Sequence, residues 1–227
     1  MKLSRIERDA GLLHLMFTVI CVSVLMLPLG LPVGLKMLML VVLYNIFTPV
    51  FGRRYPNEEW IDIWMFAFIT SLFQVMPDWF LSAQLGVLVF PEDGFFKIGD
   101  VSAYMAGLWT IPLFMIIFIG KRIKERFSET AALWGVAGSS LLIFGISEET
   151  MWLIPSWSAV NVTMIGHIAV YLLVPEIILG LSAYLAYEAI KTRSHWLKIP
   201  AAFLIMLLYT GGLSIFYFLV EKIILSS

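Results

Sequence analysis

Long apolar runs separated by short polar segments dominate the chain. Seven of these runs are long enough to cross a hydrocarbon layer of roughly 30 Å at about 1.5 Å of rise per helical residue. The predicted spanning helices cover residues 11–29, 32–51, 60–83, 101–120, 131–147, 164–190 and 199–220. The pattern therefore predicts an all-α polytopic membrane protein in which residues 1–227 form a single seven-helix membrane domain.

Positive charges are distributed unequally between the segments that join these runs. With the N-terminus in the cytoplasm, twelve of the fifteen Lys and Arg residues fall on the cytoplasmic side, where membrane proteins carry their excess of positive charge. The other three are Lys36, Lys97 and Lys222. We expect a cytoplasmic N-terminus and an extracytoplasmic C-terminus, in a bacterial cytoplasmic (inner) membrane. This orientation excludes microbial opsins and G-protein-coupled receptors.

Composition supports the membrane class and excludes other classes. Hydrophobic residues make up 60% of the chain, charged residues 14%, and the mean hydropathy is +0.92, far from soluble domains. The net charge of -1 and the absence of a dense basic patch give no indication of nucleic-acid binding. Cys21 is the only cysteine, so no internal disulfide can form. Because no metal-ligand spacing is present, we expect neither a metal nor a cofactor.

The third predicted helix carries a polar face in an otherwise apolar run. Ser71, Gln74, Asp78 and Ser82 recur at helical spacing, so they should point into the bundle, because hydrocarbon cannot satisfy them. Pro77 removes a backbone donor and predicts a kink beside Asp78.

The longest extracytoplasmic segment, residues 86–100, has apolar ends around a Pro-Glu-Asp-Gly turn signal. We expect it to fold back onto the bundle as a lid. Asp100 is expected to cap the fourth helix, with Tyr104 one turn further on and Trp109 beyond it.

Glu148 and Glu149 end the fifth helix with no lysine or arginine near them in the sequence. A charge at mid-bilayer costs about 2.5–3.5 kcal/mol on insertion scales, so such residues usually have a function. Successive helical residues point about 100° apart, so only one of the two glutamates can face the bundle squarely. The face shared with Gly145 and Trp152 favours Glu149.

Glu176 follows Pro175 in the sixth predicted helix. Helical rise from residue 164 places it roughly 18 Å below the outer end, near mid-depth. His167 and Tyr171 are expected one turn apart above it.

These acids define the predicted site. Carboxylates crowded in a poorly solvated place repel one another, so at least one should keep its proton near neutrality. A protonated acid beside aromatic rings suits chemistry that starts by protonating a carbon–carbon double bond and stabilises the resulting cation. The predicted catalytic residues are Asp78, Glu148, Glu149 and Glu176. The predicted substrate-binding residues are Gln74, Asp100, Tyr104, Trp109, Trp152, His167 and Tyr171.

The segment Ser147-Glu-Glu-Thr-Met-Trp-Leu-Ile resembles the Pro-x-Glu-Glu motif and following aromatics of membrane lycopene-cyclase domains. Asp78 and the run to Trp109 look similar to the segment that precedes that motif. The resemblance, which extends to carotenoid hydratases, implies a small multi-helix membrane enzyme that acts on an isoprenoid or carotenoid-like lipid without a redox cofactor, by cyclisation, hydration or isomerisation.

Two other functions remain open at this point. Glu176 on a broken helix could be the coupling residue of a proton- or cation-coupled carrier. The chain could also be a non-catalytic subunit that binds a lipid or pigment. The bilayer and its lipids are the expected partners, and the sequence leaves the oligomeric state open.

Overall fold

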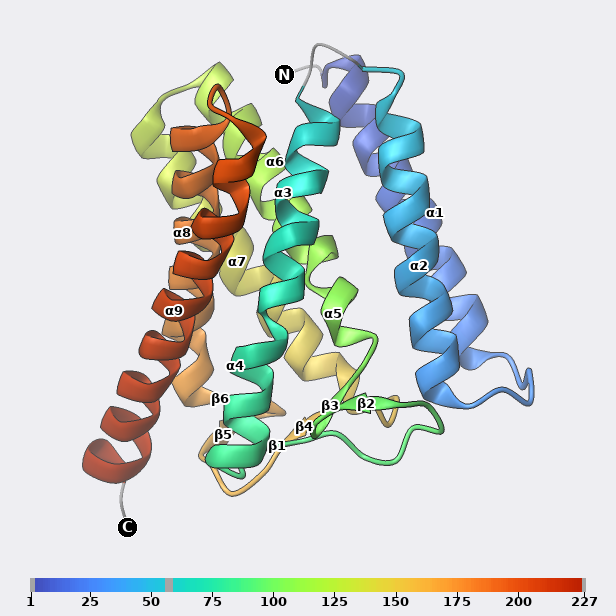
Figure 1. The fold of residues 1–227 in the computed structure, drawn as a ribbon, viewed down its shortest axis with the longest axis vertical. Helices are drawn as coiled ribbons and strands as arrows, with labels where there is room; N and C mark the ends of the chain where they lie inside the picture. The colour runs from blue at the N-terminus through green and yellow to red at the C-terminus, as the bar shows by residue number, and fades with distance from the viewer. Residues whose placement is uncertain (1–2, 56–58, 226–227) are drawn as a thin grey trace.

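The helices run roughly along one axis, and the strands gather at one end of them (Figure 1). In this computed structural model, residues 3–55 and 59–225 are described, and 73% of these residues are helical. The helical elements are α1 (Arg5–Met26), α2 (Val33–Gly52), α3 (Trp60–Phe73), α4 (Val75–Trp79), η1 (Phe80–Gln84), α5 (Met105–Leu108), α6 (Thr110–Arg126), α7 (Glu129–Met151), η2 (Val170–Leu172), α8 (Leu173–Ile190), η3 (His195–Leu197), α9 (Lys198–Tyr217) and η4 (Phe218–Ile224). The strands are β1 (Leu88–Val89), β2 (Lys97–Ile98), β3 (Val101–Ser102), β4 (Ser158–Ala159), β5 (Met164–Ile165) and β6 (Ile168–Ala169).

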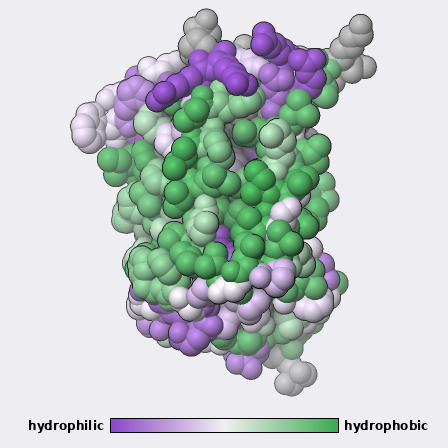
Figure 2. Space-filling model, turned by 90° about the vertical axis from the view of Figure 1, so that its right-hand side faces the viewer, coloured by the Kyte–Doolittle hydropathy of each residue, from purple (hydrophilic) through white to green (hydrophobic). Residues whose placement is uncertain are grey.

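Within residues 3–55 and 59–225, seven helical segments are long and apolar enough to cross a membrane, which confirms the seven helices predicted from hydropathy. Figure 2 shows the corresponding apolar band between two hydrophilic ends. The segments are Arg5–Met26, Val33–Gly52, Trp60–Gln84, Met105–Arg126, Glu129–Met151, Val170–Ile190 and His195–Ile224. By length and composition, this is the architecture of an integral membrane protein.

Ion pairs join the helices at the end where α1 begins. There α1 starts with a capping box, in which Ser4 and Glu7 each accept a hydrogen bond from the other's backbone N–H. The pairs link α6 to α1, α9 to α3, and α6 to α8. They are Arg126–Glu7, Lys198–Asp62 at 2.8 Å, and Lys124–Glu188 at 2.6 Å.

In the described part of the chain, three antiparallel strand pairs close the opposite end, which departs from the all-α prediction. The pairs are β1–β4, β2–β3 and β5–β6. The helices expected to start at residues 101 and 164 begin instead at Met105 and Val170. Each is preceded by a hairpin with a two-residue turn that starts at a glycine, Gly99 or Gly166, with φ of +62° or +63°. Glycine adopts this left-handed conformation without a Cβ penalty.

The two hairpins belong to a structural repeat. The sequences Ile98-Gly-Asp-Val and Ile165-Gly-His-Ile form the turns, and each is followed three residues later by a tyrosine, Tyr104 or Tyr171, that is 1% exposed. In both cases a helix and a single strand come before the hairpin, and another helix comes after it. Because β1 of the first unit pairs with β4 of the second, the two units meet side by side at this end.

The segment between residues 86 and 100 folds back onto the bundle, as expected. Val87, Leu88 and Phe90 are buried. The buried Asp93 carboxylate accepts a hydrogen bond from the Ser102 hydroxyl at 2.5 Å and holds the loop against β3.

Candidate functional site

A break in the third spanning segment positions Asp78. Pro77 has no N–H to donate to the Phe73 carbonyl, and α3 ends at Phe73 before α4 resumes at Val75. The kink predicted beside Asp78 is therefore a change of helix. Gln74 and Asp78 are 0% and 3% exposed, so the polar face predicted from spacing is buried in the bundle.

Trp109 connects Asp78 to the neighbouring helices. The Trp109 indole N–H donates to Asp78 Oδ2 at 3.0 Å. Its ring packs against Phe144 of α7, with centroids 5.5 Å apart, and edge-on against Tyr209 of α9, at 5.9 Å. One carboxylate is thus held where α4, α6, α7 and α9 meet.

Glu148, and not Glu149, faces the bundle. The buried residues Val136, Ser140 and Phe144 follow one another at steps of four along α7, and Glu148 continues this face by one more turn. Trp157 N–H donates to Glu148 Oε1 at 3.0 Å. The sequence predicts that the face shared by Gly145 and Trp152, and with it Glu149, points into the bundle. In the structure Trp152 lies beyond the last turn of α7 and is half exposed.

Glu149 belongs to the outer surface. Its side chain is 46% exposed. It accepts a hydrogen bond from the His167 backbone N–H at 2.8 Å, and its other oxygen lies 3.1 Å from His167 Nδ1. The preference for Glu149 as the inward acid is therefore wrong.

Glu176 lies in the first turn of α8 and is 2% exposed. The predicted depth of about 18 Å is wrong, because residues 164–169 form a hairpin and add no helical rise. No described residue forms a hydrogen bond with Glu176 Oε2.

The three inward acids form one cluster, which we call the acid cluster: Asp78, Glu148 and Glu176. Glu148 is close enough to interact electrostatically with both of the others, and all three lie in range of Tyr209. None of the three forms an ion pair with a residue in the part of the chain that the structure describes. Among those same residues, no group of three His, Cys, Asp or Glu side chains is arranged to hold a metal ion.

Several buried polar groups accompany the acid cluster without partners in the described chain. Both amide atoms of Gln74 belong to this set, as do the hydroxyls of Ser71 and Thr110. Gln74 and Ser71 share the helical face of Asp78. Thr110 is the next residue after Trp109, whose indole N–H donates to Asp78. Buried polar groups without a hydrogen-bond partner are rare in folded proteins, and these groups are available to bind a polar ligand.

Two of the predicted binding tyrosines lie beside the acid cluster. Tyr171 is in electrostatic range of Glu148 and Glu176 and packs edge-on against Tyr217 at 5.6 Å. The Tyr104 hydroxyl donates to the Ser156 carbonyl at 3.2 Å. Burial raises the pKa of Tyr104 above its usual range, so this hydroxyl remains a donor.

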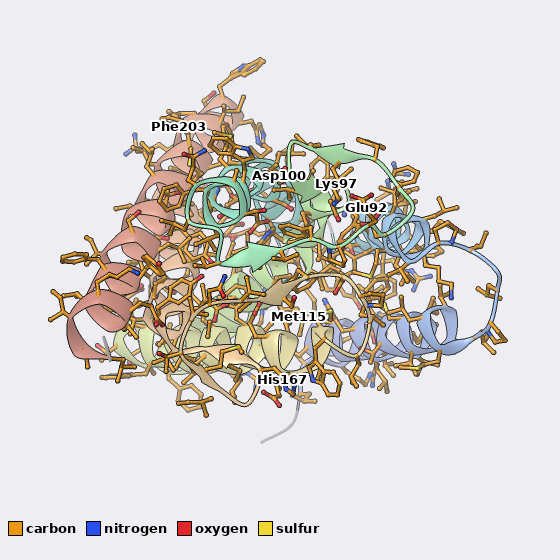
Figure 3. All side chains as sticks on the ribbon, turned by 90° about the horizontal axis from the view of Figure 1, so that it is seen from below. Glu92, Lys97, Asp100, Met115, His167 and Phe203 are labelled. Atoms are coloured by element: carbon orange, nitrogen blue, oxygen red, sulfur yellow. The ribbon has the colours of Figure 1, made fainter. Side chains whose placement is uncertain are left out.

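Asp100, Trp152 and His167 lie away from the acid cluster. Asp100 is exposed in the β2–β3 turn and does not cap a helix, and His167 is exposed in the β5–β6 turn. Figure 3 shows Asp100 and His167 on opposite sides of the bundle end. Trp152 stacks on His167 with centroids 4.4 Å apart.

Sequence reasoning missed Trp157 and Tyr209. A signal was available for the misplaced turn residues, because an apolar-Gly-x-apolar sequence indicates a two-residue hairpin. Recognising strands at this end would have placed both turns and Trp157. Tyr209 carries no comparable signal, because a tyrosine in an apolar run is most often a packing residue.

Fold and site together define a helical membrane protein with an unpaired acid cluster near one end of its bundle. The chain belongs to the family described as Domain of unknown function (DUF6989), whose model matches residues 75–220. That range contains the whole acid cluster and excludes α1 and α2. No curated protein and no solved structure matches the chain.

Proposed function

We propose that this chain is an integral membrane enzyme that performs acid–base chemistry on an isoprenoid or carotenoid-like lipid, by cyclisation, hydration or isomerisation. The observation that carries the proposal is the acid cluster, in which three carboxylates share an apolar bundle with no cationic partner among the described residues. Acids in such surroundings are costly and mark sites of function.

The hydrogen bonds of the cluster suggest different roles for its members. An indole N–H supports one oxygen of Asp78 and one of Glu148, whereas Glu176 Oε2 has no described donor. We therefore assign Glu176 as the acid that protonates a substrate double bond. Asp78 or Glu148 then accepts a proton from the neighbouring carbon, and transfer to Glu176 restores the starting state.

The walls of the cluster suit a cationic intermediate. Trp109 and Tyr209 present ring surfaces beside Asp78, and aromatic faces attract cations. The unpartnered Gln74 amide on the same face could position a water molecule or a substrate hydroxyl, which hydration requires.

We also propose a cytoplasmic N-terminus in a bacterial inner membrane. The supporting observation is the concentration of arginines and lysines at the end where α1 begins, which includes Arg53, Arg54, Lys121 and Lys191. Cytoplasmic segments carry this excess. The acid cluster then lies toward the extracytoplasmic side.

The test is deuterium incorporation into membrane lipids. Membranes that contain the protein are incubated in D₂O with isoprenoid lipids, and lipid masses are followed by mass spectrometry. The wild type should introduce carbon-bound deuterium, because the protonating acid exchanges with solvent. Glu176→Gln, which removes the proton donor, should reduce incorporation by about 100-fold or more, the usual contribution of a general acid or base. Of Glu148→Gln and Asp78→Asn, the variant that removes the base should show a loss of the same size.

Glu149→Gln is the matched control, since it changes the adjacent glutamate, which binds His167 at the surface. It should leave incorporation unchanged. Absence of incorporation in the wild type, or equal loss in Glu149→Gln and Glu148→Gln, would overturn the enzyme assignment. If all of these variants fold and retain lipid as the wild type does, the result would favour a non-catalytic lipid- or pigment-binding subunit.

A proton- or cation-coupled carrier is the second candidate. Two observations favour it: Asp78 lies beside the break between α3 and α4, and the two hairpin units form a repeat. Both features occur in carriers. A carrier should take up protons into sealed vesicles, lose this uptake in Glu176→Gln, and introduce no deuterium into lipid carbon.

A further inference from the structure

A groove lies between α1 and α2, far along the chain from the acid cluster. Its volume is about 540 Å³, within the usual range of ligand sites. The walls are apolar along most of its length. They are formed by Leu12, Leu13, Met16, Phe17, Ile20, Phe47, Val50 and Phe51, with Tyr44 and Thr48.

One end of the groove is polar and carries Asp9 and Arg54. Asp9 is already engaged, because it accepts a hydrogen bond from the Tyr55 hydroxyl and lies 3.6 Å from Arg8. Arg54 lies over the Phe51 ring at 4.8 Å. It is exposed and forms no ion pair with any residue in the described ranges.

The charge at this end is positive. Arg5 and Arg8 are exposed and act electrostatically on Asp9, and Arg54 lines the groove at the same end, so this end carries three guanidinium groups for one carboxylate. A second groove, of about 320 Å³, lies between α1 and α6. Its arginines have acidic partners, which makes it less suited to an anion. The pairs are Arg126–Glu7 and Arg122–Glu125.

We propose that the α1–α2 groove binds one anionic phospholipid, with an acyl chain along the apolar walls and the phosphate on the Arg54 guanidinium. Guanidinium binds phosphate through parallel hydrogen bonds. The charge lies where α1 begins, at the level of the hydrophilic end of the bundle in Figure 2, so a lipid in the bilayer can meet both features at once. Only 6% of the most apolar α1 window is buried, which leaves this wall free to adjust to a chain.

The probe is phosphatidylglycerol, compared with phosphatidylcholine, in nanodiscs that contain the full-length protein. Native mass spectrometry after release should find one phosphatidylglycerol retained by the wild type and little phosphatidylcholine. Arg54→Gln should reduce retention at least about fivefold, the effect of one basic residue on an anionic lipid near a membrane surface. Arg193→Gln, which changes an exposed arginine at the same end outside the groove, should retain the lipid as the wild type does.

A second variant keeps the arginine and fills the groove. Met16→Trp should also lose phosphatidylglycerol, so the test does not depend on one substitution folding. Free glycerol phosphate should not displace the lipid, because it lacks the chain. Equal retention of phosphatidylcholine, retention unchanged in both groove variants, or crosslinking through Cys21 that places a second copy in the groove would each overturn the proposal.

Discussion

The first helix, α1, and the segment Val170–Ile190, which carries Glu176, are packed very differently. In the most apolar window of α1, 6% of the residues are buried, against 50% in Val170–Ile190. Figure 1 shows α1 and α2 at one edge of the bundle, with α8 and α9 at the other. A Cβ added at Gly11 would meet nothing within 4 Å, whereas one added at Gly180 would lie 1.9 Å from Ser140 Oγ.

This difference separates two kinds of site. The acid cluster lies where helices pack closely, so its carboxylates and indoles are held in fixed positions, as acid–base chemistry requires. The groove has one loosely held wall and suits a flexible lipid chain. If the comparison is correct, equivalent changes in the two regions should have unequal effects.

The largest difference should come from the ion pairs. Lys198 is 1% exposed and lies 2.8 Å from Asp62, whereas Arg8 is 64% exposed at 3.6 Å from Asp9. Lys198→Met should lower the free energy of unfolding by about 3 kcal/mol, because it leaves a mostly buried carboxylate without its cation. Arg8→Gln should cost less than about 1 kcal/mol.

Unfolding in mixed detergent–SDS titrations, followed by tryptophan fluorescence, measures both variants. If both substitutions lower the free energy of unfolding by equally small amounts, the Lys198–Asp62 ion pair adds little to stability. The two regions would then not differ in this respect.

A smaller difference should come from glycine. Gly180→Val should lower the free energy of unfolding by about 2–3 kcal/mol, since α7 must move away from α8 to admit the side chain. Gly11→Val should change it by less than about 0.5 kcal/mol, because its surroundings are open. The same titration measures both, and a Gly11→Val effect as large as that of Gly180→Val would mean that α1 is packed against a surface beyond the described contacts.

The sequence predicted the helices because apolar run length is a strong signal. It also predicted the buried face of Gln74 and Asp78, since polar residues at helical spacing in an apolar run have few other places to go. The helix break at Pro77 followed from its missing N–H.

The errors arose at the strand-bearing end. The sequence predicts that helices begin at residues 101 and 164, although Gly99 and Gly166 between apolar residues are hairpin signals. This prediction misplaced Asp100, His167 and the depth of Glu176. Choosing between Glu148 and Glu149 required the inward face of α7, which Val136, Ser140 and Phe144 define in the structure. The six residues 141–146, which precede Ser147 and the two glutamates, are all apolar. The sequence therefore did not distinguish the inward face of this helix from the outer one.

The smallest predicted effect concerns the attachment of α1 through Tyr55. Its hydroxyl donates to Asp9, and this hydrogen bond raises the pKa of Tyr55. A raised folded-state pKa means that the contact stabilises fully below the ordinary phenol pKa of about 10 and is lost as pH rises through the raised value. Attachment of α1 should therefore weaken only at strongly alkaline pH.

Difference absorbance at 295 nm between the wild type and Tyr55→Phe isolates the titration of this phenol. In an Asp9→Asn background the midpoint should move to lower pH, because the neutral amide accepts more weakly than a carboxylate and no longer opposes the phenolate. Arg53→Gln is the control, since it changes a nearby exposed charge that does not bind Tyr55. An unchanged midpoint in Asp9→Asn would mean that Tyr55 does not anchor α1, and the N-terminal helix would then depend on Arg126–Glu7 and on the contact of His14 with Tyr44 at 3.0 Å.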